Sequence, residues 1–180
     1  MNTYTDFVKT VESTSWHQPN ERLLHAAMGL CTESAETFEC TDQQHSLEEL
    51  GDVCWYVALG LDAIGRSWEE APILTEAVFL DLVRGEDAAV SLTLHSTDIL
   101  DMVKKAVFYG KAIDQDKLYD SFVMVKNVIS YGMAFSGMPY TLDEVVNANV
   151  KKLTARYPGK FTEEAAVNRD VKEEYAAMSR

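Results

Sequence analysis

The chain has 180 residues, of which 47% are hydrophobic, and a formal net charge of −13. This length predicts one domain with its own core. A membrane-spanning helix needs about 18 consecutive apolar residues, and no uninterrupted apolar run in the sequence approaches that length. The negative charge argues against a nucleic acid polymer as partner, because such binding needs clustered Lys and Arg. Three cysteines without C-x-x-C spacing, and a start without a signal-peptide pattern, lead us to expect a cytoplasmic protein without a membrane partner.

Apolar residues recur at helical spacing through most of the chain, and no segment alternates convincingly with a period of two. In chain order we expect helices over residues 3–11, 21–40, 47–64, 67–85, 87–110, 115–136, 141–157 and 162–178. Capping boxes, in which Ser or Thr precedes Glu by three residues, mark starts at Ser46, Ser67 and Thr141. The expected fold is therefore an all-α helical bundle.

Four acidic residues, Glu33, Glu36, Glu49 and Asp52, form the pattern E-x-x-E, twelve residues, E-x-x-D. Each pair stands at i and i+3 on one helix face, so two such helices packed antiparallel bring four carboxylates together. Adjacent carboxylates repel unless they are protonated or neutralised, and a hard cation such as Mg²⁺ is the usual neutraliser of an all-oxygen site. The pattern predicts a metal site, although the helix dipole alone also favours acids near a helix start.

The chain also aligns with itself as two degenerate helical hairpins. The first copy, about residues 21–84, keeps all four acids. The second copy, about residues 87–157, has Ser121 and Met124 in place of the last two acids and ends in a basic helix. Residues 158–180 would add a C-terminal tail helix to this single domain. We therefore expect a pseudo-dimer within one chain, while the periodicity shared by any two helical hairpins is the alternative explanation.

The basic helix carries Asn149, Lys152 and Arg156 at i, i+3 and i+7, with Asn149 and Arg156 nearly on its apolar side. A cation on an apolar face needs an anion when it is buried, because an unpaired buried charge is unfavourable by several kcal/mol. The acid cluster, or a phosphate held by its metals, would serve as that anion. The alternative is a plain set of buried ion pairs with Glu33 or Glu36 that needs no ligand.

Three segments, residues 24–36, 48–57 and 149–158, contain E-x-x-E, E-L-G-D-V-x-W-Y and N-x-x-K-x-x-x-R-Y-P in that order. In this combination they resemble the MazG-like nucleoside triphosphate pyrophosphohydrolases, which belong to the all-α pyrophosphohydrolase superfamily. The resemblance spans about residues 24–169. It implies a bundle of MazG-like type and an enzyme that hydrolyses phosphoanhydrides.

By this resemblance the four acids would bind Mg²⁺, with Mn²⁺ as a substitute, and would be catalytic together with Lys152 and Arg156. These two cations would neutralise phosphate oxygens, and Asn149 would hydrogen-bond the substrate or a metal-bound water. The expected reaction is hydrolysis of the α–β phosphoanhydride of a nucleoside or deoxynucleoside triphosphate, giving the monophosphate and pyrophosphate. Such a reaction needs an activated in-line water and cations that stabilise charge on the phosphoryl oxygens.

Two other functions stay open on the sequence. A non-catalytic nucleotide-binding module would keep the pocket and sense nucleotides, and a purely structural helical protein would leave the acids paired to Lys152 and Arg156. Family members usually carry one copy per chain and pair as dimers, so a homodimer of pseudo-dimeric chains is a further option. Trp16 is a candidate for contact with a nucleobase, with core packing as the simpler explanation.

Overall fold

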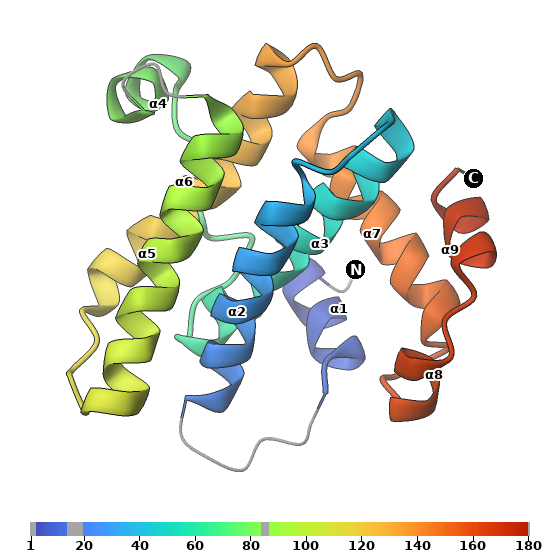
Figure 1. The fold of residues 1–180 in the computed structure, drawn as a ribbon, viewed down its shortest axis with the longest axis horizontal. Coiled ribbons are helices and arrows are strands. Elements are labelled where there is room, and N and C mark those ends of the chain that lie inside the picture. The colour runs from blue at the N-terminus through green and yellow to red at the C-terminus, as the bar shows by residue number, and fades with distance from the viewer. Residues whose placement is uncertain (1–2, 14–19, 84–86, 180) are drawn as a thin grey trace.

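A computed structural model describes residues 3–13, 20–83 and 87–179. Within these ranges the chain forms nine α-helices and no strand (Figure 1). The helices are α1 (Tyr4–Val11), α2 (Glu21–Glu36), α3 (Gln43–Ala63), α4 (Glu76–Val83), α5 (Ala88–Tyr109), α6 (Gln115–Phe135), α7 (Leu142–Arg156), α8 (Glu163–Val167) and α9 (Val171–Met178). The prediction of an all-α fold is confirmed.

Two helical hairpins, α2–α3 and α5–α6, form the body of the molecule, and α2 packs against α5 where they meet (Figure 1). On the other side, α7 packs against α3 and α9 packs against α7. The short helix α1 contacts both α3 and α7. The C-terminal segment from α7 to α9 therefore forms a second wall facing the α2–α3 hairpin.

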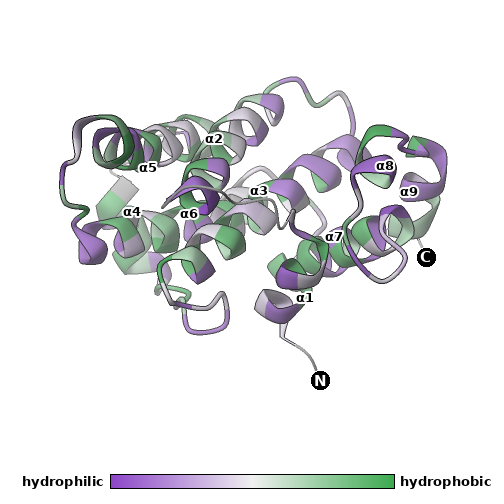
Figure 2. Ribbon diagram, turned by 90° about the horizontal axis from the view of Figure 1, so that it is seen from below, coloured by the Kyte–Doolittle hydropathy of each residue, from purple (hydrophilic) through white to green (hydrophobic). Residues whose placement is uncertain are grey.

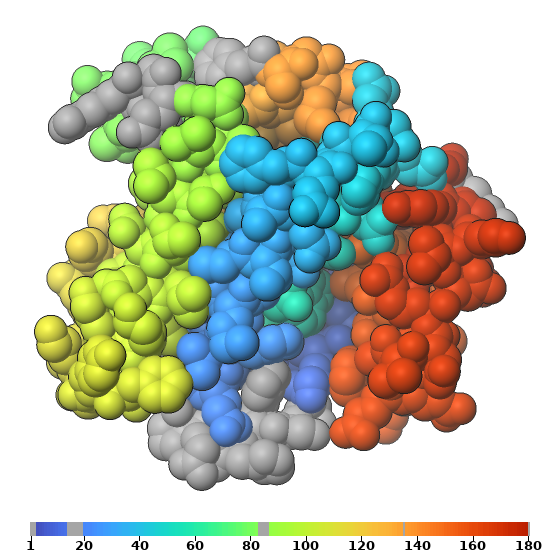
Figure 3. All heavy atoms as spheres, viewed as in Figure 1, coloured from blue at the N-terminus to red at the C-terminus, as the bar shows by residue number. Residues whose placement is uncertain are grey.

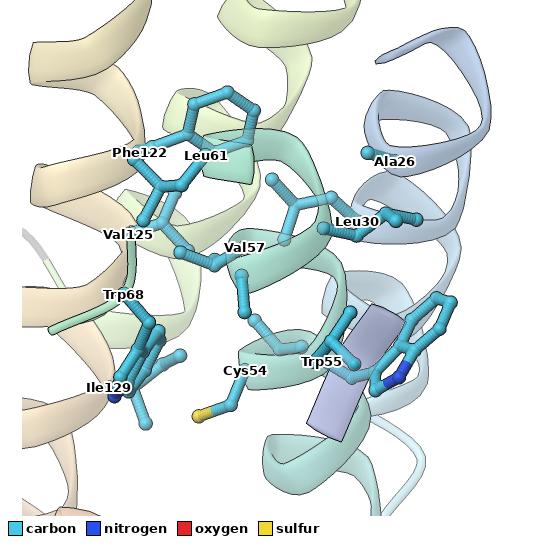
Figure 4. Close-up of a cluster of buried hydrophobic side chains, with 14 of the residues drawn as sticks. Ala26, Leu30, Cys54, Trp55, Val57, Leu61, Trp68, Phe122, Val125 and Ile129 are labelled. Carbon is cyan, nitrogen blue, oxygen red and sulfur yellow. The ribbon is translucent and has the colours of Figure 1, made fainter. Parts of the chain in front are cut away.

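The core lies on both sides of α3. Figure 4 shows α3 between α2 and α6, with apolar side chains directed toward both neighbours. Val57, Leu61, Phe122 and Leu30 are completely buried there. Figure 2 shows hydrophobic and hydrophilic residues alternating along most helices, the pattern of helices with one buried and one exposed face. This packing fixes the direction in which the acidic face of the α2–α3 hairpin points.

One contact between the hairpins has the form that a tandem repeat requires. The predicted repeat aligns residues 25–30 with 87–92 and therefore pairs Ser34 with Ser96. In the structure the hydroxyl oxygens of these two buried serines lie 2.8 Å apart across the α2–α5 interface. Residues on a two-fold axis contact their own equivalents, so this contact agrees with the alignment. The pseudo-dimer nevertheless stays a prediction.

The start of α3 differs from the expected one. The side chain of Asp42, rather than that of Ser46, caps the helix by accepting a hydrogen bond of 2.8 Å from the His45 amide. The Ser46 hydroxyl bonds instead to the Asp42 carbonyl oxygen at 3.0 Å. Because the helix begins at Gln43, Glu49 lies beyond its first turn, where the dipole contributes little. The helix dipole therefore does not account for the acids.

The expected tail helix over residues 162–178 is wrong in detail, because the segment forms the separate helices α8 and α9. Residues 168–170 interrupt it, and the Asp170 side chain caps the new helix by accepting from the amides of Lys172 and Glu173. The Thr141 capping box is confirmed at the start of α7. The break at residues 168–170 redirects the chain along α7, where α9 packs.

Gly60 is a position at which α3 tolerates no side chain. A Cβ atom there would lie 2.2 Å from the Cζ atom of Phe122 on α6. We expect Gly60→Ala to lower the free energy of unfolding by about 1–3 kcal/mol through overpacking, measured by urea denaturation. Adding Phe122→Leu should restore part of the loss. An unchanged midpoint for the single variant would contradict this packing.

Candidate metal and phosphate site

A cleft of about 410 Å³ separates the α2–α3 hairpin from the C-terminal wall. Figure 3 shows this hollow between α2 and the α8–α9 end of the chain, with atoms of α3 and α1 visible deep inside it. The cleft is lined by all four predicted acids and, on the opposite wall, by Arg156. The structure thus brings five of the seven predicted site residues to one cavity.

Three of the acids form a compact cluster. Glu33 and Glu36 come from the last turn of α2, and Glu49 comes from the second turn of α3. One carboxylate oxygen of each lies within 4.8 Å of those of the other two. Glu49 is buried, Glu33 is half-buried and Glu36 is exposed, so the cluster opens toward solvent on one side. Carboxylate oxygens at this separation suit a hard cation, which takes oxygen ligands at 2.0–2.6 Å.

The electrostatics of the cluster also favour a cation. Burial, reinforced by the negative charges of Asp52, Glu36 and Glu49, raises the pKa of Glu33 to about 8. Burial and neighbouring acids raise the pKa of Glu49 as well. A carboxylate that resists ionisation in this way gains most when a positive charge arrives. The donor set and its charge therefore fit a divalent cation.

Asp52, the fourth acid, is held by the opposite wall. It accepts a hydrogen bond of 2.9 Å from the Asn149 side-chain amide and is ion-paired with the Lys152 ammonium. The Tyr4 hydroxyl donates a hydrogen bond of 2.8 Å to the side-chain oxygen Oδ1 of Asn149, which fixes the orientation of the amide. A Cβ on Gly51 would lie 3.0 Å from the Asn149 Cβ, so the glycine lets α7 approach closely. Asp52 is thereby locked at the edge of the cluster.

Asn149 and Lys152 do not line the cleft as the sequence suggests. They are 1% and 0% exposed and lie behind Asp52, and the Lys152 ammonium also lies 3.4 Å from a carboxylate oxygen of Glu48. The ion pairs with Glu33 or Glu36 that formed the alternative explanation are absent among the described residues, because Lys152 pairs with Asp52 and Glu48 and Arg156 pairs with Glu174. In this arrangement Asn149 and Lys152 position the acidic wall, and contact with phosphate would require Asp52 to move.

The C-terminal segment contributes two groups, Arg169 and Glu174, and the sequence pattern gave no role to Glu174. Glu174 on α9 is 2% exposed and binds Arg156 through two hydrogen bonds, of 2.8 and 2.7 Å. Arg169 lines the cleft and bonds to Glu174 at 2.8 Å and to Glu48 at 3.1 Å. Lys152 and Arg156 take their acceptors from different elements, α3 and α9, so their i, i+4 spacing gave no signal for Glu174.

Trp55 lines the cleft one turn beyond Asp52. Its side chain is 9% exposed, and its Nε1–H has no hydrogen-bond acceptor among the described residues. Figure 4 shows Trp55 projecting from α3 on the side away from Cys54. A buried donor without an acceptor is unusual in a folded chain, so it is a second sign that this cleft receives a ligand. Trp16, the residue that the sequence offered as a candidate for nucleobase contact, lies outside the described residues.

The raised pKa of Glu33 predicts a pH dependence of stability. Without divalent cations, the contribution of Glu33 to the free energy of unfolding is fully present below its ordinary pKa of 4.5 and is lost as pH rises through about 8. Urea denaturation at about pH 5 and about pH 8.5 should therefore show a larger decline for the wild type than for Glu33→Gln. Adding Mg²⁺ should reduce the wild-type decline. Equal declines in both proteins would contradict the raised pKa.

Comparisons of the chain with protein-family models, with curated proteins and with solved structures gave no match. Within residues 3–13, 20–83 and 87–179, no helix is long and apolar enough to cross a membrane. The cleft and the motifs that line it are therefore the features of the chain that bear on its function.

Proposed function

We propose that the protein is a Mg²⁺-dependent nucleotide pyrophosphohydrolase that cleaves the α–β phosphoanhydride of nucleoside triphosphates. The observation that carries this proposal is the cluster of Glu33, Glu36 and Glu49 in a cleft whose other wall carries Arg156. A triphosphate is the kind of ligand that needs both walls, since it bridges metal ions on one side and binds guanidinium groups on the other. The E-L-G-D-V-x-W-Y and N-x-x-K-x-x-x-R-Y-P motifs supply two of the helices that form these walls.

Glu33, Glu36 and Glu49 would hold the cation, with Asp52 beside them. Bound there, Mg²⁺ would supply Lewis-acid stabilisation of charge on the phosphoryl oxygens. The chain's own residues have separate tasks. Lys152 and Asn149 keep the Asp52 carboxylate fixed, and a fixed carboxylate loses little entropy when substrate arrives. The acid wall also offers carboxylates as proton acceptors for the attacking water.

The aromatic residues of the cleft suit the nucleoside part of the substrate. Trp55, Tyr56 and His25 contact one another through their rings, with centroids 4.9 to 6.2 Å apart, at the end of the α2–α3 wall beyond the acids. An acceptor on the sugar or base would satisfy the Trp55 indole N–H. The wall therefore has an acidic part for the phosphates and an aromatic part for the nucleoside.

The tandem repeat would explain why one chain provides both walls. In this proposal α7 belongs to the second copy and reaches across to α3 of the first, so the cleft is shared between copies. The Ser34–Ser96 contact supports this arrangement. Homodimerisation of such chains would then be unnecessary for completing the site.

Product analysis by ³¹P NMR tests the proposed reaction. Incubation with each nucleoside and deoxynucleoside triphosphate and Mg²⁺ should yield the monophosphate and pyrophosphate from at least one of them. Formation of diphosphate and orthophosphate would contradict cleavage at the α–β bond. Tight Mg²⁺-dependent nucleotide binding without any product would instead support the sensing module.

A further inference from the structure

We propose that Arg156 and Arg169 together form the binding site for the two distal phosphates, and that Glu174 is the residue that positions both guanidinium groups. This inference rests on the proposed function and adds the orientation of the substrate and two residues outside the recognised motifs. It also defines the ligand class of this part of the cleft as linked phosphates rather than a monophosphate.

The two arginines lie side by side on the C-terminal wall although they are thirteen residues apart. Arg156 ends α7, and Arg169 lies in the break between α8 and α9. Both line the main cleft, and both also line a smaller hollow of about 140 Å³ in front of Glu174. Their side chains are 13% and 38% exposed, so Arg169 stands at the rim where a ligand enters. The acid cluster lines the same cleft from the opposite wall.

The hydrogen bonds of the two arginines leave donors in reserve. Arg156 uses Nε and Nη2 for Glu174, which leaves its Nη1 group. Among the residues that the structure describes, Arg169 uses only Nη2, for Glu174 and Glu48, which leaves Nε and Nη1. A guanidinium has five N–H donors in a planar fork that matches the oxygens of a phosphate. The two guanidinium groups can therefore bind phosphate through these remaining donors while their other N–H groups stay bonded to Glu174.

Glu174 is suited to such a positioning role. Burial opposes its ionisation, yet the hydrogen bonds from Arg156 and Arg169 hold its pKa at about 2. A carboxylate that stays charged keeps both guanidinium groups in one orientation before the ligand arrives. Preorganised donors of this kind lose little conformational entropy on binding, which favours affinity.

The position of the pair selects linked phosphates. A cation held by Glu33, Glu36 and Glu49 would stabilise charge at the bond that is cleaved, and both arginines line the same cleft from the opposite wall. A pyrophosphate unit offers oxygens to both walls, one phosphate group to the cation and the next to the two guanidinium groups opposite. Charge that develops on the leaving pyrophosphate would then be stabilised by Arg156 and Arg169.

Calorimetric titration with inorganic pyrophosphate in the presence of Mg²⁺ tests this site. We expect Arg169→Gln to weaken pyrophosphate binding by about 10-fold or more, since a hydrogen bond to a charged group is lost. Binding of a nucleoside monophosphate should be unchanged. Arg169→Lys keeps the positive charge but loses the planar fork of donors, so its affinity for pyrophosphate should lie between those of the wild type and Arg169→Gln. Lys172→Gln removes the same charge from an exposed position on α9 and is the matched control.

A structural role alone would give a different result. If Arg169 only fixes the tail, Arg169→Gln lowers the melting temperature and affects both ligands equally, and the proposal is wrong. Glu174→Gln should weaken pyrophosphate binding in the same selective way. Absence of pyrophosphate binding to the wild type would also overturn the site. Nucleotide hydrolysis with unchanged pyrophosphate affinity in Arg169→Gln would reject only this inference, whereas Arg169-dependent pyrophosphate binding without hydrolysis would reject only the proposed reaction.

Discussion

Glu49→Gln is expected to lower kcat/KM for Mg²⁺-dependent pyrophosphate release by more than about 100-fold, since even outer partners of metal ligands typically contribute 10–100-fold. Glu49 is buried, and its carboxylate lies within 4.8 Å of those of Glu33 and Glu36. Glutamine keeps the size of the side chain and removes the charge that a hard cation requires. The assay follows pyrophosphate release from the preferred nucleotide at increasing Mg²⁺ concentrations.

Glu39→Gln provides the matched control for this experiment. Glu39 is exposed in the turn that connects α2 and α3, close to the cluster in sequence but outside it. The same loss of one negative charge should leave kcat/KM nearly unchanged there. Equal effects of both substitutions would indicate a general electrostatic influence and would contradict a specific metal site.

Lys152→Met is expected to lower the free energy of unfolding by about 3–5 kcal/mol, because it removes the buried cation that pairs with Asp52 and helps neutralise Glu48. The Lys152 side chain is 0% exposed and is ion-paired with Asp52 and Glu48. Methionine has a similar apolar stem, so the loss of charge dominates over the loss of packing. Urea denaturation at neutral pH measures the change, and Lys151→Met, on the exposed side of the same helix turn, is the control.

A double variant keeps this prediction testable if Lys152→Met is too unstable to purify. Lys152→Met combined with Asp52→Asn removes the main charge pair as a unit, which is often nearly neutral in buried sites. We expect the double variant to recover a large part of the lost stability. A simple sum of the two single effects would show that Lys152 and Asp52 are not coupled.

Helical periodicity and capping residues predicted the all-α class, because each helix must bury one apolar face whatever its neighbours are. The start of α3 was missed for a local reason. Asp42 competes with Ser46 as a cap, and the pattern around Ser46 and Glu49 resembles a capping box although Glu49 faces the acid cluster. The residue type alone does not show which of two nearby candidates, Asp42 or Ser46, caps the helix.

The acid cluster was predicted from spacing, because i, i+3 pairs on two antiparallel helices converge when the faces that carry them pack together. The partners of Lys152 and Arg156 were not predicted. Which acid pairs with Lys152 depends on the register of α7 against α3, and the choice of Asp52 and Glu48 follows from contacts far apart in sequence. The position of Glu174 depends in turn on the break at residues 168–170, which redirects α9 along α7.

Binding of Mn²⁺, followed by electron paramagnetic resonance as the free ion is depleted, tests most directly whether the acid cluster is a cation site. The account predicts saturable Mn²⁺ binding to the wild type that Mg²⁺ displaces, that Glu39→Gln retains and that Glu49→Gln abolishes. Binding that persists unchanged in Glu49→Gln, or no saturable binding by the wild type, would contradict the central claim that Glu33, Glu36 and Glu49 form a metal site.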